Sequence, residues 1–145
     1  MKVLFLDATN TTTSVIAQRI FAKSCESSSA GMSIGESTPK QTYDLLKKHK
    51  LDCSVHLPTQ VTVEAMNDAD RIICLSRGCY NAIAKLAPEF LHKTLDAESI
   101  LCEPVIEPFD MGESAYETCF SQMRMLKNAV DFFLKSGVFV IFFVA

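Results

Sequence analysis

The stretch MKVLFLDATNTTTSVIA, residues 1–17, decides the fold class of this chain. Residues 2–6 are rich in strand-forming side chains and contain no turn residue, which predicts a short strand buried on both faces. Residues 7–14 carry five hydroxyl side chains and no large apolar one, and apolar residues resume at helical spacing from Val15. In open parallel sheets such a loop lies at the carboxyl end of a strand, where helix N–H groups attract anions and ligands bind. The sequence therefore places the functional site in the loop of residues 7–14.

The length and composition of the chain limit the classes of protein to consider. Its 145 residues suit one domain. The net charge is −3 and the sequence has no basic cluster, so we expect no nucleic-acid partner. The six cysteines show no C-x-x-C pair and no zinc spacing, and no signal-peptide pattern precedes the first strand. These features predict a cytoplasmic protein with reduced cysteines and without a metal site or a cofactor. Cysteines with apolar neighbours are expected to be small core residues.

Strand-like and helical segments alternate along the rest of the chain. This alternation predicts right-handed crossovers and a parallel sheet that helices cover on both sides, an α/β fold. The expected elements are a helix from Ser14, its N-cap, to about Lys23; a strand within 27–32; a helix capped by Thr38 that runs from Pro39 to about Lys50; a short helix through Met66 capped by Thr59 or Thr62; a strand at 70–75; a helix ending near Pro88; a strand within 94–101; and a helix from Glu113 to about Lys135.

The first and last of these helices carry a clear apolar face. In the first helix, Val15, Ile16, Ile20 and Phe21 are expected to point inward. In the last helix, apolar residues at spacings of three and four form one stripe, made of Tyr116, Phe120, Met123, Leu126, Val130, Phe133 and Leu134.

The end of the chain is an uncharged, strand-prone segment. Residues 137–144 are too few to span a bilayer, which takes about 20 residues in a helix, so we expect no membrane span. We therefore divide the chain into a domain of residues 1–136 and an apolar tail of residues 137–145 that packs internally. The alternative is a tail that forms an edge strand and pairs two copies of the chain as a homodimer.

Five short segments, in this order, carry a resemblance to a known family. They are residues 3–5 (VLF); Asn10 and Ser14 in the loop; residues 29–31 (SAG); residues 75–77 (LSR) ahead of 87–89 (APE); and residues 106–109 (IEPF) before the last helix. From residue 1 to about 135, the chain resembles the low-molecular-weight protein tyrosine phosphatases, including their arginine-phosphatase branch and related arsenate reductases. The resemblance implies a flavodoxin-like, four-stranded parallel sheet flanked by helices, with a phosphate-binding loop (P-loop) after the first strand and a general acid from a late loop.

The chain departs from this family at the residues that perform the reaction. The family loop has a cysteine, five residues, an arginine, and then serine or threonine, which places Asp7 at the nucleophile position and Thr13 at the arginine position. A thiolate attacks phosphorus, and the arginine binds two phosphate oxygens through its planar guanidinium. Asp7 instead repels a phosphate, because two unit charges ~4 Å apart cost ~4 kcal/mol at an effective dielectric of 20. Thr9 stands where the family has a nearby glycine, and threonine is expected to disfavour a positive φ at this position.

Other positions of the site match the family better. Asn10, Thr11 and Ser14 agree with residues that the family or its arginine-phosphatase branch uses, and Ala8, Thr9 and Thr12 complete the expected binding loop. Glu107, before Pro108, stands at the position of the general acid, an aspartate in the family. Its extra methylene group moves the carboxyl by more than an ångström, which matters for positioned catalysis. Asp110 is the candidate substitute acid.

These residues predict a member of the family with a degenerate catalytic loop, a non-catalytic binding or regulatory protein. Its loop would hold a neutral or cationic group, water, or a protein partner's side chain. The first alternative is an active phosphatase, on a phosphoprotein or a small phosphomonoester, or an arsenate reductase-like enzyme. The second is an aspartyl-phosphate phosphatase with Asp7 as nucleophile, since DATNTTT (residues 7–13) resembles the Asp-x-Thr-Gly-Thr loop of haloacid-dehalogenase-type phosphatases. The lysine and paired-aspartate motifs of that family are missing. The third is a loop that only caps a helix.

Overall fold

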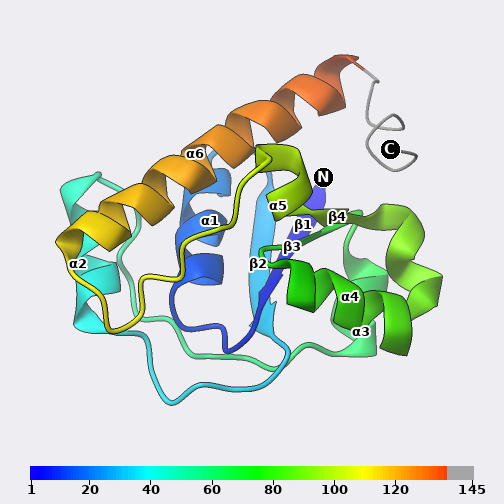
Figure 1. The fold of residues 1–145 in the computed structure, drawn as a ribbon, viewed down its shortest axis with the longest axis horizontal. Helices are drawn as coiled ribbons and strands as arrows, with labels where there is room; N and C mark the ends of the chain where they lie inside the picture. Colours follow the sequence, from blue (N-terminus) through cyan, green and yellow to red (C-terminus); the bar gives the residue numbers. More distant parts are fainter. Residues whose placement is uncertain (137–145) are drawn as a thin grey trace.

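The computed structural model describes residues 1–136, which form an α/β fold around one parallel sheet (Figure 1). The sheet has four strands in the order β2-β1-β3-β4. β1 (Lys2–Asp7) pairs in parallel with β2 (Glu26–Gly31) and β3 (Arg71–Cys74), and β3 pairs in parallel with β4 (Thr94–Asp96). The expected four-stranded parallel sheet is confirmed, and β1 lies inside it with the loop of residues 7–14 at its carboxyl end.

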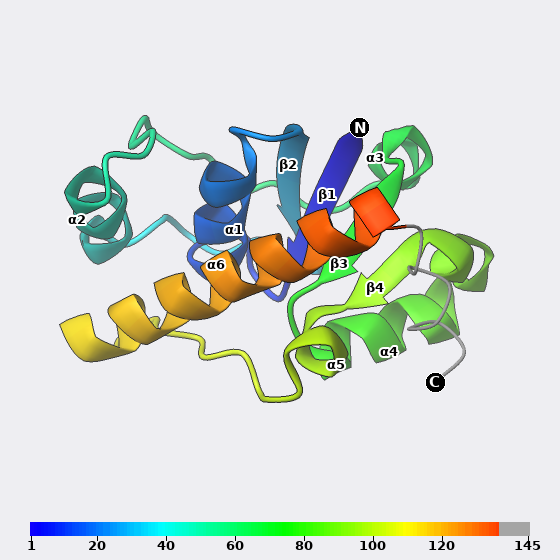
Figure 2. The same cartoon turned by 90° about the horizontal axis from the view of Figure 1, so that it is seen from above.

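Helices cover both faces of this sheet. They are α1 (Thr13–Phe21), α2 (Lys40–Lys48), α3 (Val63–Asp68), α4 (Arg77–Leu86), the 3-10 helix η1 (Pro88–Lys93), α5 (Ala97–Leu101) and α6 (Glu113–Ser136). Figures 1 and 2 show α1 and α6 on one side of the sheet and α3 and α4 on the other.

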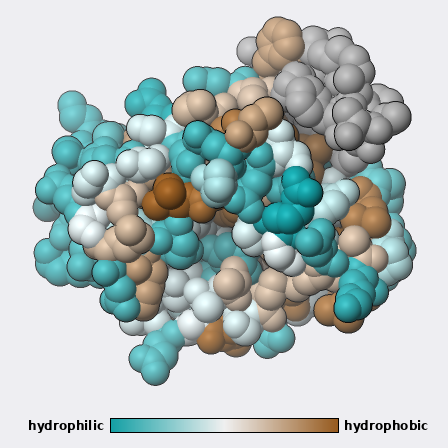
Figure 3. Space-filling view, viewed as in Figure 1, coloured by the Kyte–Doolittle hydropathy of each residue, from teal (hydrophilic) through white to brown (hydrophobic). Residues whose placement is uncertain are grey.

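The alternation of side chains along β1 builds a separate core under each layer of helices. Val3 and Phe5 join the cluster that packs against α1 and α6, whereas Leu4 and Leu6 join the cluster that packs against α3 and α4. All four side chains are buried, as expected for a strand covered on both faces. The face shown in Figure 3 is mostly hydrophilic, with apolar residues in small, separate areas.

Most of the predicted elements are present, with corrections at their ends. Ser14 is not an N-cap, because α1 begins at Thr13 with Thr12 in the cap position. Thr38 is not an N-cap either, since Pro39 holds that position before α2. The Thr62 hydroxyl does cap α3, where it accepts a hydrogen bond from the Ala65 N–H.

The last strand is shorter than the predicted segment 94–101. It ends at Asp96, whose carboxylate accepts a hydrogen bond from the Glu98 N–H and so starts α5 at Ala97. The inward stripe of α6 is confirmed from Tyr116 to Val130. Three of the cysteines, at 74, 79 and 119, are buried core residues, while Cys53 and Cys102 are exposed and Cys25 is half-buried.

The tail of residues 137–145, with its internal-packing and homodimer interpretations, lies outside the described residues. The same holds for the side chains of Phe133 and Leu134. Within residues 1–136, none of the helices combines the length and the apolar character needed to cross a membrane.

Candidate functional site

The loop after β1 lies against the end of β2, and this close approach requires a glycine. A Cβ at Gly31 would lie 2.8 Å from the Thr9 carbonyl carbon and 2.9 Å from the Asn10 nitrogen, so the position has no room for a side chain. The chain after Gly31 then follows the loop, where the N–H groups of Met32 and Ser33 donate to the carbonyls of Asp7 and Ala8. The backbone of the loop is therefore fixed from the β2 side.

The Asp7 carboxylate closes the interior of this loop. Its Oδ1 accepts a hydrogen bond of 2.7 Å from the Asn10 N–H, and its Oδ2 accepts one of 2.9 Å from the Ser14 N–H in the first turn of α1. The side chain is only 5% exposed, and this burial raises the pKa of Asp7, against the opposing effect of its bonds with Ser14 and Asn10. A carboxyl group supplied by the chain itself thus takes up two N–H groups, one in the loop and one at the N-terminus of α1.

Asn10 ties the loop to three other parts of the chain. Its Nδ2 donates to the hydroxyls of Ser14 and Ser29, at 2.9 Å each, and its Oδ1 accepts a bond of 2.9 Å from the Thr59 N–H. His56 Nε2 lies 2.9 Å from the same Oδ1 and 3.1 Å from the Asn10 carbonyl oxygen. Asn10 is fully buried, and its contact with Ser14 is buried as well, while the contacts with Ser29, His56 and Thr59 are partly buried.

The strained backbone position of the loop is Asn10 and not Thr9. Asn10 has φ 56°, and Thr9 is not among the described residues with positive φ. This agrees with the expectation that threonine at position 9 disfavours a positive φ. Asparagine adopts this left-handed conformation more readily than other residues with a side chain.

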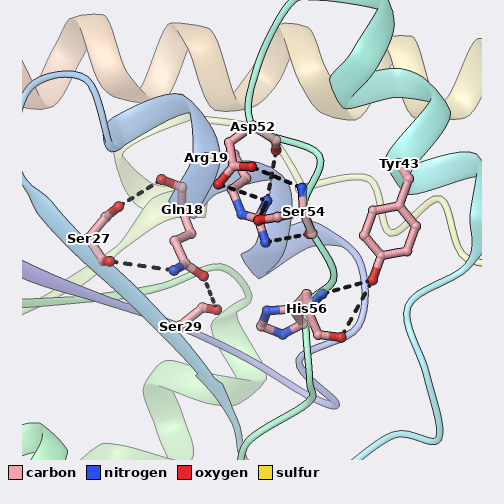
Figure 4. A network of polar contacts seen from close by, with 8 residues as sticks. All are labelled: Gln18, Arg19, Ser27, Ser29, Tyr43, Asp52, Ser54 and His56. Carbon is pink, nitrogen blue, oxygen red and sulfur yellow. Dashed lines mark hydrogen bonds and ion pairs between the residues drawn. The ribbon is translucent and has the colours of Figure 1, made fainter.

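Arg19 and Tyr43 hold the segment around His56 beside the loop (Figure 4). The Arg19 guanidinium donates to the carbonyls of Asp52, at 2.8 Å, and Ser54, at 3.1 Å. The Tyr43 hydroxyl accepts a bond of 3.0 Å from the His56 N–H. Burial lowers the pKa of His56, which favours the neutral ring with Nε2–H directed at Asn10. Sequence reasoning missed these residues, because only the tertiary fold brings 52–56 to the loop.

Thr13 and Glu107 meet although they lie far apart in the sequence. The Thr13 hydroxyl donates a bond of 2.9 Å to Glu107 Oε2, and Glu107 Oε1 accepts one of 3.1 Å from the Phe109 N–H. Removal of water from the carboxyl raises the pKa of Glu107, and the charge of Asp7 adds to the effect. The structure thus brings together the residues that the resemblance placed at the arginine and general-acid positions.

A cavity of about 550 Å³ opens beside the loop. Its walls come from the loop itself, from the segment 35–39 and from the segment 107–110, and the lining residues are Ala8, Thr9, Thr11, Gly35, Glu36, Ser37, Pro39, Glu107, Phe109 and Asp110. The remaining predicted site residues, namely Asp7, Asn10, Thr12, Thr13 and Ser14, are buried behind this wall. In the part of the chain that the structure describes, no group of three or more His, Cys, Asp or Glu residues could hold a metal ion.

Comparisons with known proteins agree with the fold. The mutant YwlE from Bacillus subtilis superimposes with a TM-score of 0.85 at 18% identity, over 94% of this chain and 99% of that chain. YwlE arginine phosphatase from Geobacillus stearothermophilus gives 0.84 at 19% identity, over 94% of each chain. Vibrio vulnificus Wzb, in complex with benzylphosphonate, gives 0.80 at 21% identity, over 88% of this chain and 94% of that chain.

These identities support the shared fold alone, and the search of curated proteins gave no match. The family, however, follows from the sequence directly. Residues 2–136 match the family described as low molecular weight phosphotyrosine protein phosphatase. This match spans nearly the whole chain, and the chain therefore belongs to the low molecular weight phosphotyrosine protein phosphatase family.

Proposed function

We propose that this chain is a catalytically inactive member of its family, which uses the cavity beside the loop of residues 7–14 to bind a protein partner or a small ligand. The observation that carries the proposal is the Asp7 carboxylate, which accepts the N–H groups of Asn10 and Ser14. The cytoplasmic localisation expected from the sequence is part of the same proposal.

Among the residues that the structure describes, no thiol near the loop is suited to replace the missing nucleophile. Cys119, on α6, is the cysteine whose thiol interacts with Thr13. Burial raises the pKa of Cys119 to about 12, so that the thiol stays protonated at neutral pH. Its burial also keeps it out of the cavity.

Asp7 is itself placed poorly for attack on phosphorus. Both of its oxygens accept backbone hydrogen bonds, and the residue does not line the cavity. A nucleophile has to reach the reacting atom, which makes the aspartyl-phosphate mechanism the weaker alternative.

The charge of the site also differs from what a phosphoryl substrate needs. Wzb from Vibrio vulnificus was solved with benzylphosphonate, an anion. An anion at the loop of this chain would lie near Asp7 and Glu107, without an arginine at position 13 to offset their charges. A neutral or cationic ligand is therefore the better match.

Hydrolysis assays test this proposal. With p-nitrophenyl phosphate or phosphoarginine, with and without Mg²⁺, we expect turnover by the purified protein to equal that of buffer. The Asp7→Asn variant, checked for folding by circular dichroism, serves as the matched control. Turnover by the parent that disappears in Asp7→Asn would overturn the proposal and favour the aspartyl-phosphate mechanism.

A further inference from the structure

All titratable residues that line the cavity beside the loop carry the same charge. They are Glu36, Glu107 and Asp110, and the lining contains no lysine, arginine or histidine among the residues that the structure describes. The buried Asp7 adds a further carboxylate behind the wall. A cavity with walls of one sign concentrates the field within it, so this one attracts a cation.

The chain does not supply that cation itself. Within residues 1–136, none of the ion pairs includes Glu36, Glu107 or Asp110. Lys40, next to the lining residue Pro39, pairs instead with Asp44 at 2.8 Å. The negative charge of the cavity is therefore left for an external group to compensate.

Phe109 provides a second, independent feature that suits a cation. The residue lines the cavity and is 46% exposed, which leaves an apolar ring open to an incoming group. The face of an aromatic ring attracts ammonium and guanidinium groups, and this attraction grows when water is excluded. A ring beside carboxylates favours an organic cation with an apolar stem over a hydrated metal ion.

Exposed apolar residues next to the lining segments point to a macromolecular ligand. Ile34 precedes Gly35 and is 58% exposed, and Met111 follows Asp110 and is 52% exposed. Apolar side chains around a cavity with charged residues in its walls are typical of a surface that a protein partner covers.

We infer that the cavity receives a basic side chain, lysine or arginine, from a protein partner, with the charged group among Glu36, Glu107 and Asp110 and the stem against Phe109. This inference rests on the proposed function, because it names the ligand of the same site. It requires no reaction, since the cation is held by charge and by the aromatic ring.

Fluorescence anisotropy with labelled peptides tests the inference. The probes are fluorescein-labelled pentapeptides with leucine on each side of a central arginine, lysine or citrulline, where citrulline is the neutral isostere of arginine. We expect the arginine and lysine peptides to bind the full chain, and the citrulline peptide to bind at least about tenfold more weakly. No binding of the basic peptides at millimolar concentration, or equal binding of the citrulline peptide, would overturn the inference.

Charge variants of the protein provide the second arm of the test. Glu36→Gln combined with Asp110→Asn should weaken binding of the arginine peptide at least about fivefold, and Phe109→Leu should weaken it while preserving the apolar wall. Glu89→Gln, at an exposed position of η1, is the matched control and should change nothing. Equal losses in the control and the cavity variants would refute the inference. Phosphatase turnover would refute the proposed function instead, so the two failures are distinguishable.

Discussion

At the scale of single residues, Asp7 carries the proposal that this loop does not bind a phosphoryl group. The family resemblance places Asp7 at the position of the nucleophile, and here its carboxyl group accepts hydrogen bonds from the backbone of its own loop. Two N–H groups of the loop and of the start of α1 are thereby used internally. We propose that these two contacts, besides stabilising the fold, leave no site for a phosphoryl group in the loop.

Burial of Asp7 makes stability depend on pH. Its pKa is raised in the folded state, so between the ordinary value and the raised one the folded chain holds a proton that the unfolded chain releases. The contribution of this proton to the free energy of unfolding is complete below the pKa of Asp7 in the unfolded chain. It is lost as the pH rises through the pKa of Asp7 in the folded chain. We expect the parent to lose stability relative to Asp7→Asn across this window, by at most about 1.4 kcal/mol per pH unit.

Urea unfolding of both proteins between pH 3 and pH 8 measures this difference. Glu89→Gln, at an exposed site, is the control and should run parallel to the parent. Parallel curves for Asp7→Asn and the parent would show that the raised pKa of Asp7 has been misassigned.

Asn10 gives a second prediction at this scale. Replacing it with alanine or glycine removes the bonds to Ser14, Ser29 and Thr59, and we expect each change to lower the free energy of unfolding by roughly 2–4 kcal/mol. Because φ is 56° there, Asn10→Ala should be about 1 kcal/mol less stable than Asn10→Gly. Chemical denaturation decides this, and equal stabilities of the two variants would contradict the assigned backbone strain.

At the scale of elements, the sequence predicts those parts whose pattern is local. β1 follows from its uninterrupted apolar run, and α6 follows from a stripe that repeats over its 24 residues. The sequence misplaces the cap of α1 at Ser14, because several hydroxyl residues in a row can each cap a helix. It misplaces the cap of α2 by one residue, since Pro39 and not Thr38 precedes the first helical residue. In this loop, the Asp7 carboxyl group accepts a hydrogen bond from the Ser14 N–H, and no local sequence pattern indicates this contact.

The residues of the site fall into the same two groups, those that the sequence predicts and those that only the fold reveals. The loop, Thr13 and Glu107 were predicted through the family resemblance, and the structure brings them into contact. Arg19 and His56 were not predicted, because they act across 33 and 46 residues of sequence.

Arg19 connects α1 to the segment 52–54, and we expect this segment to depend on it. Arg19→Met keeps the apolar stem and removes the bonds to Asp52 and Ser54, so the segment should open more often. We expect hydrogen exchange of the amides of residues 52–58 to accelerate about tenfold, while exchange in β1 stays unchanged. Lys23→Met, at an exposed position, is the control. Unchanged exchange in Arg19→Met would exclude this role of Arg19.

At the scale of the whole molecule, one fold brings together three separate segments at the carboxyl edge of the sheet. Thr13 and Glu107 are 94 residues apart in sequence, yet their side chains share a hydrogen bond of 2.9 Å. The family architecture is therefore retained. We propose that the catalytic function is not, since fold alone does not fix function.

The tail of residues 137–145 gives a prediction from its sequence alone. We propose that it packs internally, since each exposed Val, Ile or Phe would forgo ~1.5–3 kcal/mol of burial. Truncation after Ser136 should then lower the melting temperature and leave the association state unchanged. Thermal melts and sedimentation of the full-length and 1–136 proteins compare the two interpretations, and a stable monomer obtained only by truncation would favour the homodimer.

The central claim, that Asp7 excludes phosphoryl groups from the loop, is tested most directly by anion binding. Isothermal titration calorimetry with orthovanadate and with phosphate at pH 7 compares the parent with the combined Asp7→Cys and Thr13→Arg variant. We expect no binding by the parent at millimolar anion and measurable binding by the variant, because the variant regains free N–H groups and a guanidinium. Micromolar binding of phosphate by the parent would contradict the claim.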